Sequence, residues 1–176
     1  MKIIISPAKK MNIREDALEW ADLPCFLSRA EELKKYIQGL DLEQARKLWQ
    51  CNETIARLNY RRFQDMDLER RLTPALLSYE GIQYQYMAPG VFEQGQWDYV
   101  QEHLRILSGF YGILKPLDGI VPYRLEMQAK VELPSGIKSL YDYWGSAICR
   151  ELAADETLIV NLASKEYSRA VEPYLE

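Results

Sequence analysis

The first ten residues, MKIIISPAKK (1–10), contain the pattern that decides the fold. The three isoleucines at 3–5 form a continuous β-branched run, which is too short for a helix and typical of a strand buried on both faces. The stretch TLIVNL (157–162) repeats the pattern near the other end of the chain. Polar turns follow both runs, at SPAK (6–9) and NLAS (161–164). If the two strands are parallel neighbours, these turns share one sheet edge, where ligand sites of open α/β sheets form.

Helix signals fill much of the chain between these two strands. Capping patterns predict helices that begin at Ser28, Asp41, Asn52 and Ser164, and a short one after Thr73. Apolar periodicity predicts a further helix through Val100, Leu104 and Leu107 and another over 140–152. Residues 82–96 suggest a strand fragment and loop, and residues 121–131 an extended stretch. We therefore expect one mixed α+β domain over 1–176, with a partly parallel central sheet flanked by helices.

Composition excludes several classes of protein. The chain has 22 Lys and Arg against 26 Asp and Glu, a net charge of −4, and a hydrophobic content of 48%, as is ordinary for a globular protein. No apolar run approaches the roughly 20 residues that span a bilayer, and the N-terminus lacks a signal-peptide cleavage site. The three scattered cysteines favour a reducing cytoplasm over a disulfide framework, and we expect them to be unpaired and not peroxide sensors.

Residues 103–130 form a locally basic segment in this acidic protein. Arg105, Lys115, Arg124 and Lys130 outnumber its two acidic residues. A helix through Val100, Leu104 and Leu107 is expected to enter the turn Gly109-Phe110-Tyr111-Gly112, giving a helix-hairpin-helix element over about 97–118. Backbone N–H groups of such a surface turn could donate hydrogen bonds to a DNA phosphate. The alternative is a turn that merely connects two helices.

Arg124 and Glu126 are two residues apart in the extended stretch, so they point to the same face. One interpretation is a structural ion pair. The other is an arginine that is directed at a phosphate and oriented by the glutamate.

Other chemistries have little support in the sequence. His103 is the only histidine, without a nucleophile motif nearby, and no metal-ligand cluster or nucleotide-binding glycine motif is present. We therefore expect no cofactor and no metal site. Paired cations such as Arg61-Arg62 and Arg70-Arg71 are interpreted as solvated helix faces.

Four motifs in order along the chain carry a family resemblance. They are SPAK (6–9), the block 103–130, LYDYWG (140–145), and NLAS (161–164) with Glu166-Tyr167. Together they resemble the YaaA family of peroxide stress proteins. The resemblance implies a cytoplasmic bacterial protein that restrains unincorporated iron during peroxide stress, and a positively charged cleft that binds DNA without strong sequence preference. Family members look several tens of residues longer, so we expect this sequence to be truncated at its C-terminus.

These observations lead to three hypotheses about function. The first is a DNA-binding stress protein with no membrane partner, in which iron is affected only indirectly. The second is an enzyme that acts on a nucleotide or nucleic acid through Lys9, Arg124, Glu126 and Asp142. Direct iron binding is the third. The expected DNA-contacting residues are Lys9, Lys10, Arg105, Gly109, Tyr111, Gly112, Lys115 and Arg124, and the expected polar cleft residues are Ser6, Glu126, Asp142, Asn161 and Ser164.

Overall fold

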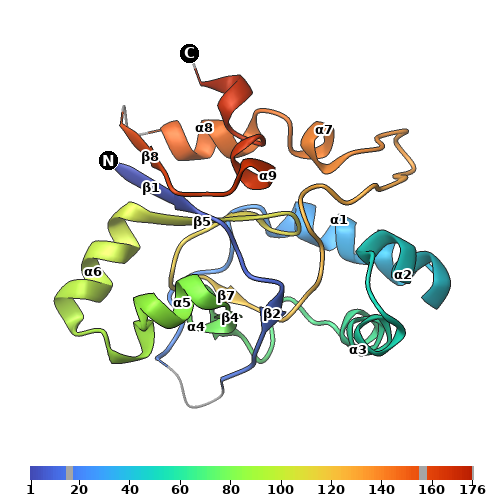
Figure 1. Ribbon diagram of the computed structural model, residues 1–176, viewed down its shortest axis with the longest axis horizontal. Coiled ribbons are helices and arrows are strands. Elements are labelled where there is room, and N and C mark those ends of the chain that lie inside the picture. Colours follow the sequence, from blue (N-terminus) through green and yellow to red (C-terminus); the bar gives the residue numbers. More distant parts are fainter. Residues whose placement is uncertain (15–17, 155–157, 176) are drawn as a thin grey trace.

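A mixed sheet lies at the centre of the protein in the computed structural model, which describes residues 1–14, 18–154 and 158–175 (Figure 1). Its strand order is β6-β5-β1-β8. β1 (Lys2–Ile5) pairs in parallel with both β5 (Leu104–Ser108) and β8 (Ile159–Asn161), and β6 (Gly112–Leu114) runs antiparallel to β5. The predicted mixed α+β class and the pairing of the two β-branched strands are confirmed. Thr157, the expected start of the second strand, lies outside the described residues.

Two small antiparallel ladders lie below the sheet in the view of Figure 1. β2 (Lys10–Met11) pairs with β4 (Tyr79–Glu80), and β3 (Thr73–Pro74) pairs with β7 (Gly119–Ile120). The short helix α4 (Ala75–Ser78) connects β3 to β4. These ladders hold the segment after β1 against the middle of the chain.

The first three helices follow the sequence signals closely. They are α1 (Leu27–Gln38), α2 (Leu42–Trp49) and α3 (Glu53–Gln64). Asp41 and Gln44 form the predicted capping box of α2, and the side chain of Asn52 caps α3. The start predicted at Ser28 is wrong, because α1 begins one residue earlier with Phe26 as its N-cap and without a side-chain cap.

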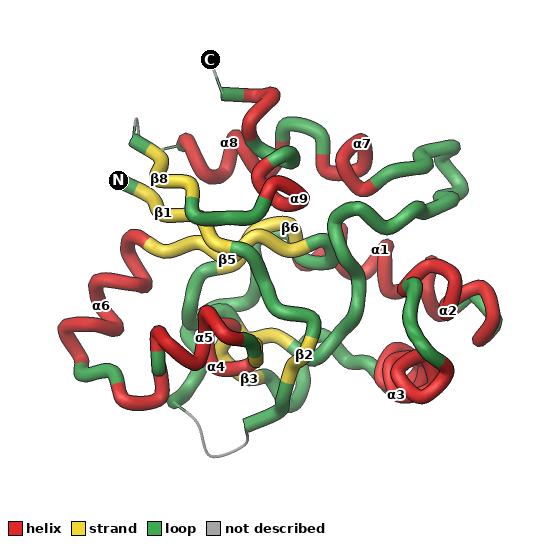
Figure 2. The backbone as a smooth tube through the Cα atoms, in the orientation of Figure 1, coloured by secondary structure: helices red, strands yellow, loops and turns green. Residues whose placement is uncertain are grey.

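The remaining helices surround the sheet (Figure 2). They are α5 (Ile82–Met87), α6 (Gln94–His103), α7 (Leu140–Trp144), α8 (Ala147–Ala153) and α9 (Lys165–Ser168), with 3₁₀ turns η1 (Pro89–Val91) and η2 (Glu172–Tyr174). The strand fragment expected within 82–96 is therefore wrong. The helix expected over 140–152 is two helices, separated at Gly145, whose φ is 48°. No helix in the described part of the chain is long and apolar enough to cross a membrane.

The predicted helix-hairpin-helix over 97–118 is wrong. α6 ends at His103, and residues 104–108 form β5 in the sheet. The turn at 109–112 therefore joins two antiparallel strands. The spacing of Val100, Leu104 and Leu107 fits a helix face, but pairing with β1 and β6 determines the local structure here.

Candidate functional site

The carboxyl ends of β1 and β8 meet, as the sequence predicts for parallel strands. Ser6 follows β1, and its Oγ accepts a 2.8 Å hydrogen bond from the backbone N–H of Ser164, the N-cap of α9. The two hydroxyl oxygens are 3.2 Å apart. Asn161 lies at the end of β8, where its Oδ1 accepts from the backbone of Ala163 and its amide donates to Glu172. Two of the predicted cleft residues, Ser6 and Ser164, are thus in direct contact.

Lys9, Glu126 and Arg124 form a continuous chain of charges beside this edge. Lys9 Nζ lies 2.9 Å from one carboxylate oxygen of Glu126, and an Arg124 Nη lies 3.6 Å from the other. The Lys9 side chain is 66% exposed, whereas that of Arg124 is only 11% exposed. Among the described residues, nothing accepts a hydrogen bond from the buried Nε of Arg124. The structure therefore contains the Arg124–Glu126 ion pair, the first of the two interpretations, and leaves one guanidinium N–H unsatisfied.

A second carboxylate, that of Glu166 on α9, completes the group. Burial raises the pKa of Glu166, the nearby Glu126 carboxylate raises it further, and Lys9 partly opposes both. One carboxylate oxygen of Glu166 accepts from the backbone N–H of Gln128, 3.3 Å away. We call Ser6, Lys9, Arg124, Glu126, Ser164 and Glu166 the strand-end cluster.

Hydrogen bonds of buried tyrosines hold the segments that carry the strand-end cluster. The hydroxyl of Tyr123, next to Arg124, lies 2.6 Å from Ser108 Oγ and 2.7 Å from the hydroxyl of Tyr79. Tyr84 donates a 2.8 Å hydrogen bond to the backbone carbonyl of Ser6. Burial raises the pKa of Tyr123 to about 12, so these hydroxyls stay protonated and fix the segments that carry Ser6 and Arg124.

Three further neighbours of the cluster were not predicted. Tyr141 on α7 donates a 2.7 Å hydrogen bond to the carbonyl of Glu166, and the guanidinium of Arg169 lies 4.8 Å from the centre of its ring. Cys51 lies within electrostatic range of Arg124 and Glu126, although burial is the main cause that raises its thiol pKa. Tyr141, like Glu166, had a signal in the sequence as part of a family motif, whereas Cys51 and Arg169 had none.

The turn at 109–112 does not emerge at the surface, so the expectation of an exposed phosphate-binding turn is wrong. Phe110 and Tyr111 are fully buried, and their backbone amides both donate to Ser108 Oγ. Gly109 packs against the backbone of residues 125–127, and Gly112 against the Trp144 indole. The amides predicted to hold a phosphate are already satisfied within the protein.

Arg105 and Lys115 lie outside the strand-end cluster, in a separate pocket. Together with Asp22, Cys25, Asp118 and Glu151 they line a polar pocket of about 230 Å³ that shares no residue with the strand-end cluster. The buried Asp118 accepts a 2.8 Å hydrogen bond from the backbone N–H of Lys115, and burial raises the pKa of this carboxyl to about 7. The predicted DNA-contacting residues therefore do not form one site: Lys9 and Arg124 lie in the cluster, and Arg105 and Lys115 line this pocket.

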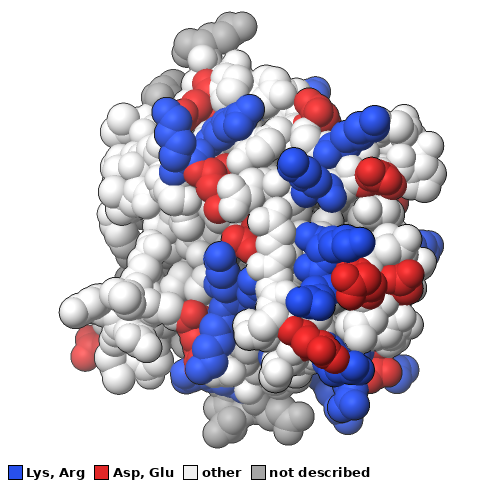
Figure 3. Space-filling view, turned by 45° about the vertical axis from the view of Figure 1, so that its right-hand side comes forward, with Lys and Arg blue, Asp and Glu red and all other residues white. Residues whose placement is uncertain are grey.

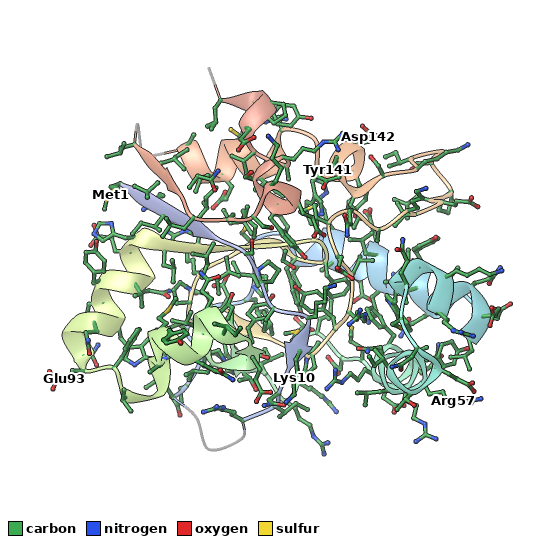
Figure 4. All side chains as sticks on the ribbon, viewed as in Figure 1. Met1, Lys10, Arg57, Glu93, Tyr141 and Asp142 are labelled. Carbon is green, nitrogen blue, oxygen red and sulfur yellow. The ribbon has the colours of Figure 1, made fainter. Side chains whose placement is uncertain are left out.

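The side chains of Asp142 and Lys10 have partners outside the strand-end cluster. The Asp142 carboxylate accepts a 2.7 Å hydrogen bond from Ser139, whose Oγ caps α7, so it supports a helix start. Lys10 is 78% exposed and pairs with Glu80 across the β2–β4 ladder. Figure 4 shows Lys10 and Asp142 far apart on the molecule. No group of three or more potential metal ligands occurs among the residues that the structure describes.

The fold and the cluster define a class: a mixed α+β protein with buried and exposed cations and two carboxylates at the carboxyl ends of its parallel strands. The profile of the family described as peroxide stress protein YaaA matches residues 1–176. A UPF0246 protein of Desulfitobacterium hafniense is 57% identical over 175 residues, which are 99% of this chain and 69% of the relative. UPF0246 proteins of Agathobacter rectalis and Lactiplantibacillus plantarum are 53% and 51% identical over 99% of this chain and 70% of each relative. The chain belongs to the YaaA peroxide stress protein family.

Proposed function

We propose that this protein acts in the bacterial response to peroxide by binding the DNA backbone without sequence preference, with the exposed part of the strand-end cluster around Lys9 as the contact surface. In this role it shields DNA in the cytoplasm and limits free iron only indirectly. The observation that carries the proposal is the ammonium group of Lys9, which is exposed yet held at the polar edge of the sheet by Glu126. Phosphate contacts of this kind position a protein on DNA without reading its sequence.

Further cations lie within reach of the same edge. Lys165 directly precedes Glu166 on α9, Arg169 follows three residues later as the C-cap, and both are exposed. Figure 3 shows Lys and Arg side chains spread over one face of the molecule, with Asp and Glu side chains between them. The mixture favours a local, salt-sensitive contact, because the net charge of the whole chain is −4.

The test is binding to a labelled DNA duplex at several salt concentrations, followed by fluorescence anisotropy. Lys9→Glu is expected to weaken binding to all sequences alike and to lower the salt slope of log K by about one unit for the lost phosphate contact. Lys2→Glu is the matched control, since Lys2 lies on the same strand at the opposite edge of the sheet. Equal affinity and slope for folded Lys9→Glu and the unchanged protein would contradict the proposal.

A second candidate, an enzyme acting on a nucleotide, is favoured by one specific observation. The Arg124 side chain is too deeply buried to meet a duplex phosphate, yet its Nε has no partner among the described residues. A small phosphate group fits such an arginine better, with Glu126 or Glu166 as the proton carrier. Stabilisation of the protein by ATP that is lost in Arg124→Lys would support this candidate, and stabilisation retained in that variant would contradict it.

A further inference from the structure

A groove beside α3 combines two arginine pairs with exposed aliphatic side chains. It has a volume of about 580 Å³ and is bordered by α3, the segment after it and the residues before Tyr123. Leu58, Arg61, Arg62 and Asp65 line it from one face of α3 and its C-cap, as their spacing of three and four residues requires. Arg70 and Arg71 approach from the following segment.

The arginines of the groove differ in their exposure and in the contacts that hold their side chains. Arg62 is half-buried and donates to the carbonyl of Met11 at 3.3 Å, which anchors the wall of the groove. Arg70 lies 3.6 Å from Asp67 in an exposed pair, which contributes little by itself. Arg71 is exposed and adopts a left-handed backbone conformation with φ of 52°, which is uncommon for a residue other than glycine. Among the described lining residues, four arginines outnumber two aspartates, so these side chains give the groove a positive net charge.

The apolar part of the groove is what distinguishes it from an ordinary charged surface. Leu58 is 50% exposed and Ile13 is 52% exposed, and the more buried Val121 and Met66 continue the apolar surface inward. Large aliphatic side chains left open to water beside a recess are typical of a binding surface. The interpretation of Arg61-Arg62 and Arg70-Arg71 as solvated helix faces does not account for this juxtaposition.

We propose that this groove, named the arginine groove, binds an acidic peptide segment that carries large aliphatic side chains. Guanidinium groups form directional paired hydrogen bonds with carboxylates, and the aliphatic side chains of the same segment cover Leu58 and Ile13. DNA fits less well, because none of the described lining residues is aromatic and the phosphate backbone leaves the aliphatic surface uncovered. The partner is thus a protein with an acidic, aliphatic segment, and this proposal does not rest on the proposed DNA binding.

The test uses a fluorescently labelled peptide of alternating Glu and Leu residues, with a second peptide in which Ser replaces every Leu. The first is expected to bind measurably and the second much more weakly. Arg61→Glu should lower the affinity for the first peptide by roughly tenfold through lost charge complementarity. Arg57→Glu is the matched control, because Arg57 is also an exposed arginine on α3 but lies outside the groove. Figure 4 shows it at the outer end of the molecule.

The aliphatic contribution is tested separately with Leu58→Ser, and with Ile13→Ser if the first variant does not fold. Either should weaken binding of the Glu-Leu peptide, whereas Ile82→Ser, at a 74% exposed position outside the groove, should not. A DNA duplex of matched charge is the third probe. Binding of DNA that depends on Arg61 and not on Leu58, equal binding of both peptides, or no binding of the Glu-Leu peptide would each overturn the proposal.

Discussion

Gly112 shows how a single residue fixes the turn between β5 and β6. Its φ is 77°, and a Cβ placed on it would lie 2.8 Å from Cζ3 of Trp144. We expect Gly112→Ala to lower the free energy of unfolding by about 2–4 kcal/mol, because backbone strain and overpacking add. Gly136→Ala is the matched control: its φ is 84°, but nothing lies within 4 Å of the added carbon, so only about 1–2 kcal/mol is expected. Urea titration of both variants measures the difference, and equal losses would show that Trp144 does not confine the turn.

Asp118 gives the protein a pH-dependent stability. Burial raises the pKa of its carboxyl from 3.8 to about 7, against the opposing hydrogen bond from the Lys115 backbone. Because the folded state holds this proton more tightly than the unfolded state, the contribution of Asp118 to stability is greatest at low pH and falls as the pH rises towards 7. Asp118→Asn lacks this titration, so the stability of the variant relative to the original protein should increase across that range, by on the order of a few kcal/mol. Denaturation curves at a series of pH values test this, and a constant difference would contradict it.

At the scale of elements, one serine joins the end of β1 to the start of α9. Ser6 Oγ accepts a hydrogen bond from the backbone N–H of Ser164. Backbone N–H groups at the start of a helix have no acceptor within the helix, so this contact satisfies a group that would otherwise lack a partner. We expect Ser6→Ala to cost about 1 kcal/mol of stability and to speed hydrogen exchange of the α9 amides. Ser28→Ala at the start of α1 is the control, because its helix begins without a side-chain cap. The same exchange rates in both variants would show that the serine contact does not hold α9.

The elements that the sequence predicts well are those whose local signals are unambiguous. The isoleucines of β1 and the caps at Asp41 and Asn52 belong to this class, and the structure has them as expected. β5 was predicted as helix because Leu104 and Leu107 satisfy a helical spacing with Val100. Only the pairing of β5 between β1 and β6 decides its conformation, and the pairing with β1 joins residues about a hundred positions apart. α5 was missed for the converse reason, since Tyr84 and Tyr86 resemble strand residues.

At the scale of the whole molecule, the sequence predicts that a polar site forms at the carboxyl ends of the parallel strands, but it does not predict every residue of that site. The parallel pairing of β1 and β8 brings Ser6 and Ser164 together. Arg124 and Glu126 meet for a different reason, because residues two apart in an extended segment point to the same face. Tyr141 joins them only through the folding of α7 against α9, which no local pattern reveals. Asp142 was assigned to the cleft, yet its spacing from Ser139 is that of a capping pair, and this signal was already present in the sequence.

The position of β8 leads to a prediction about association. An unbroken apolar run predicts an internal strand, but β8 is the outer strand of the sheet in the described part of the chain. Leu158 is 57% exposed and Leu162 is 63% exposed on either side of it. An open strand edge with exposed leucines favours edge-to-edge pairing. We therefore expect this chain to self-associate at high concentration, and Leu162→Lys to reduce that association without loss of stability.

Sedimentation velocity over a range of protein concentrations measures this effect. Ile82→Lys is the matched control, because Ile82 is 74% exposed but lies on α5, which is not next to β8 in the sheet. A lysine beside β8 opposes pairing through its charge and its cost of burial, whereas a lysine on α5 changes only the net charge. Equal association of the two variants would mean that the added charge, and not the open edge of β8, controls how copies of the chain meet.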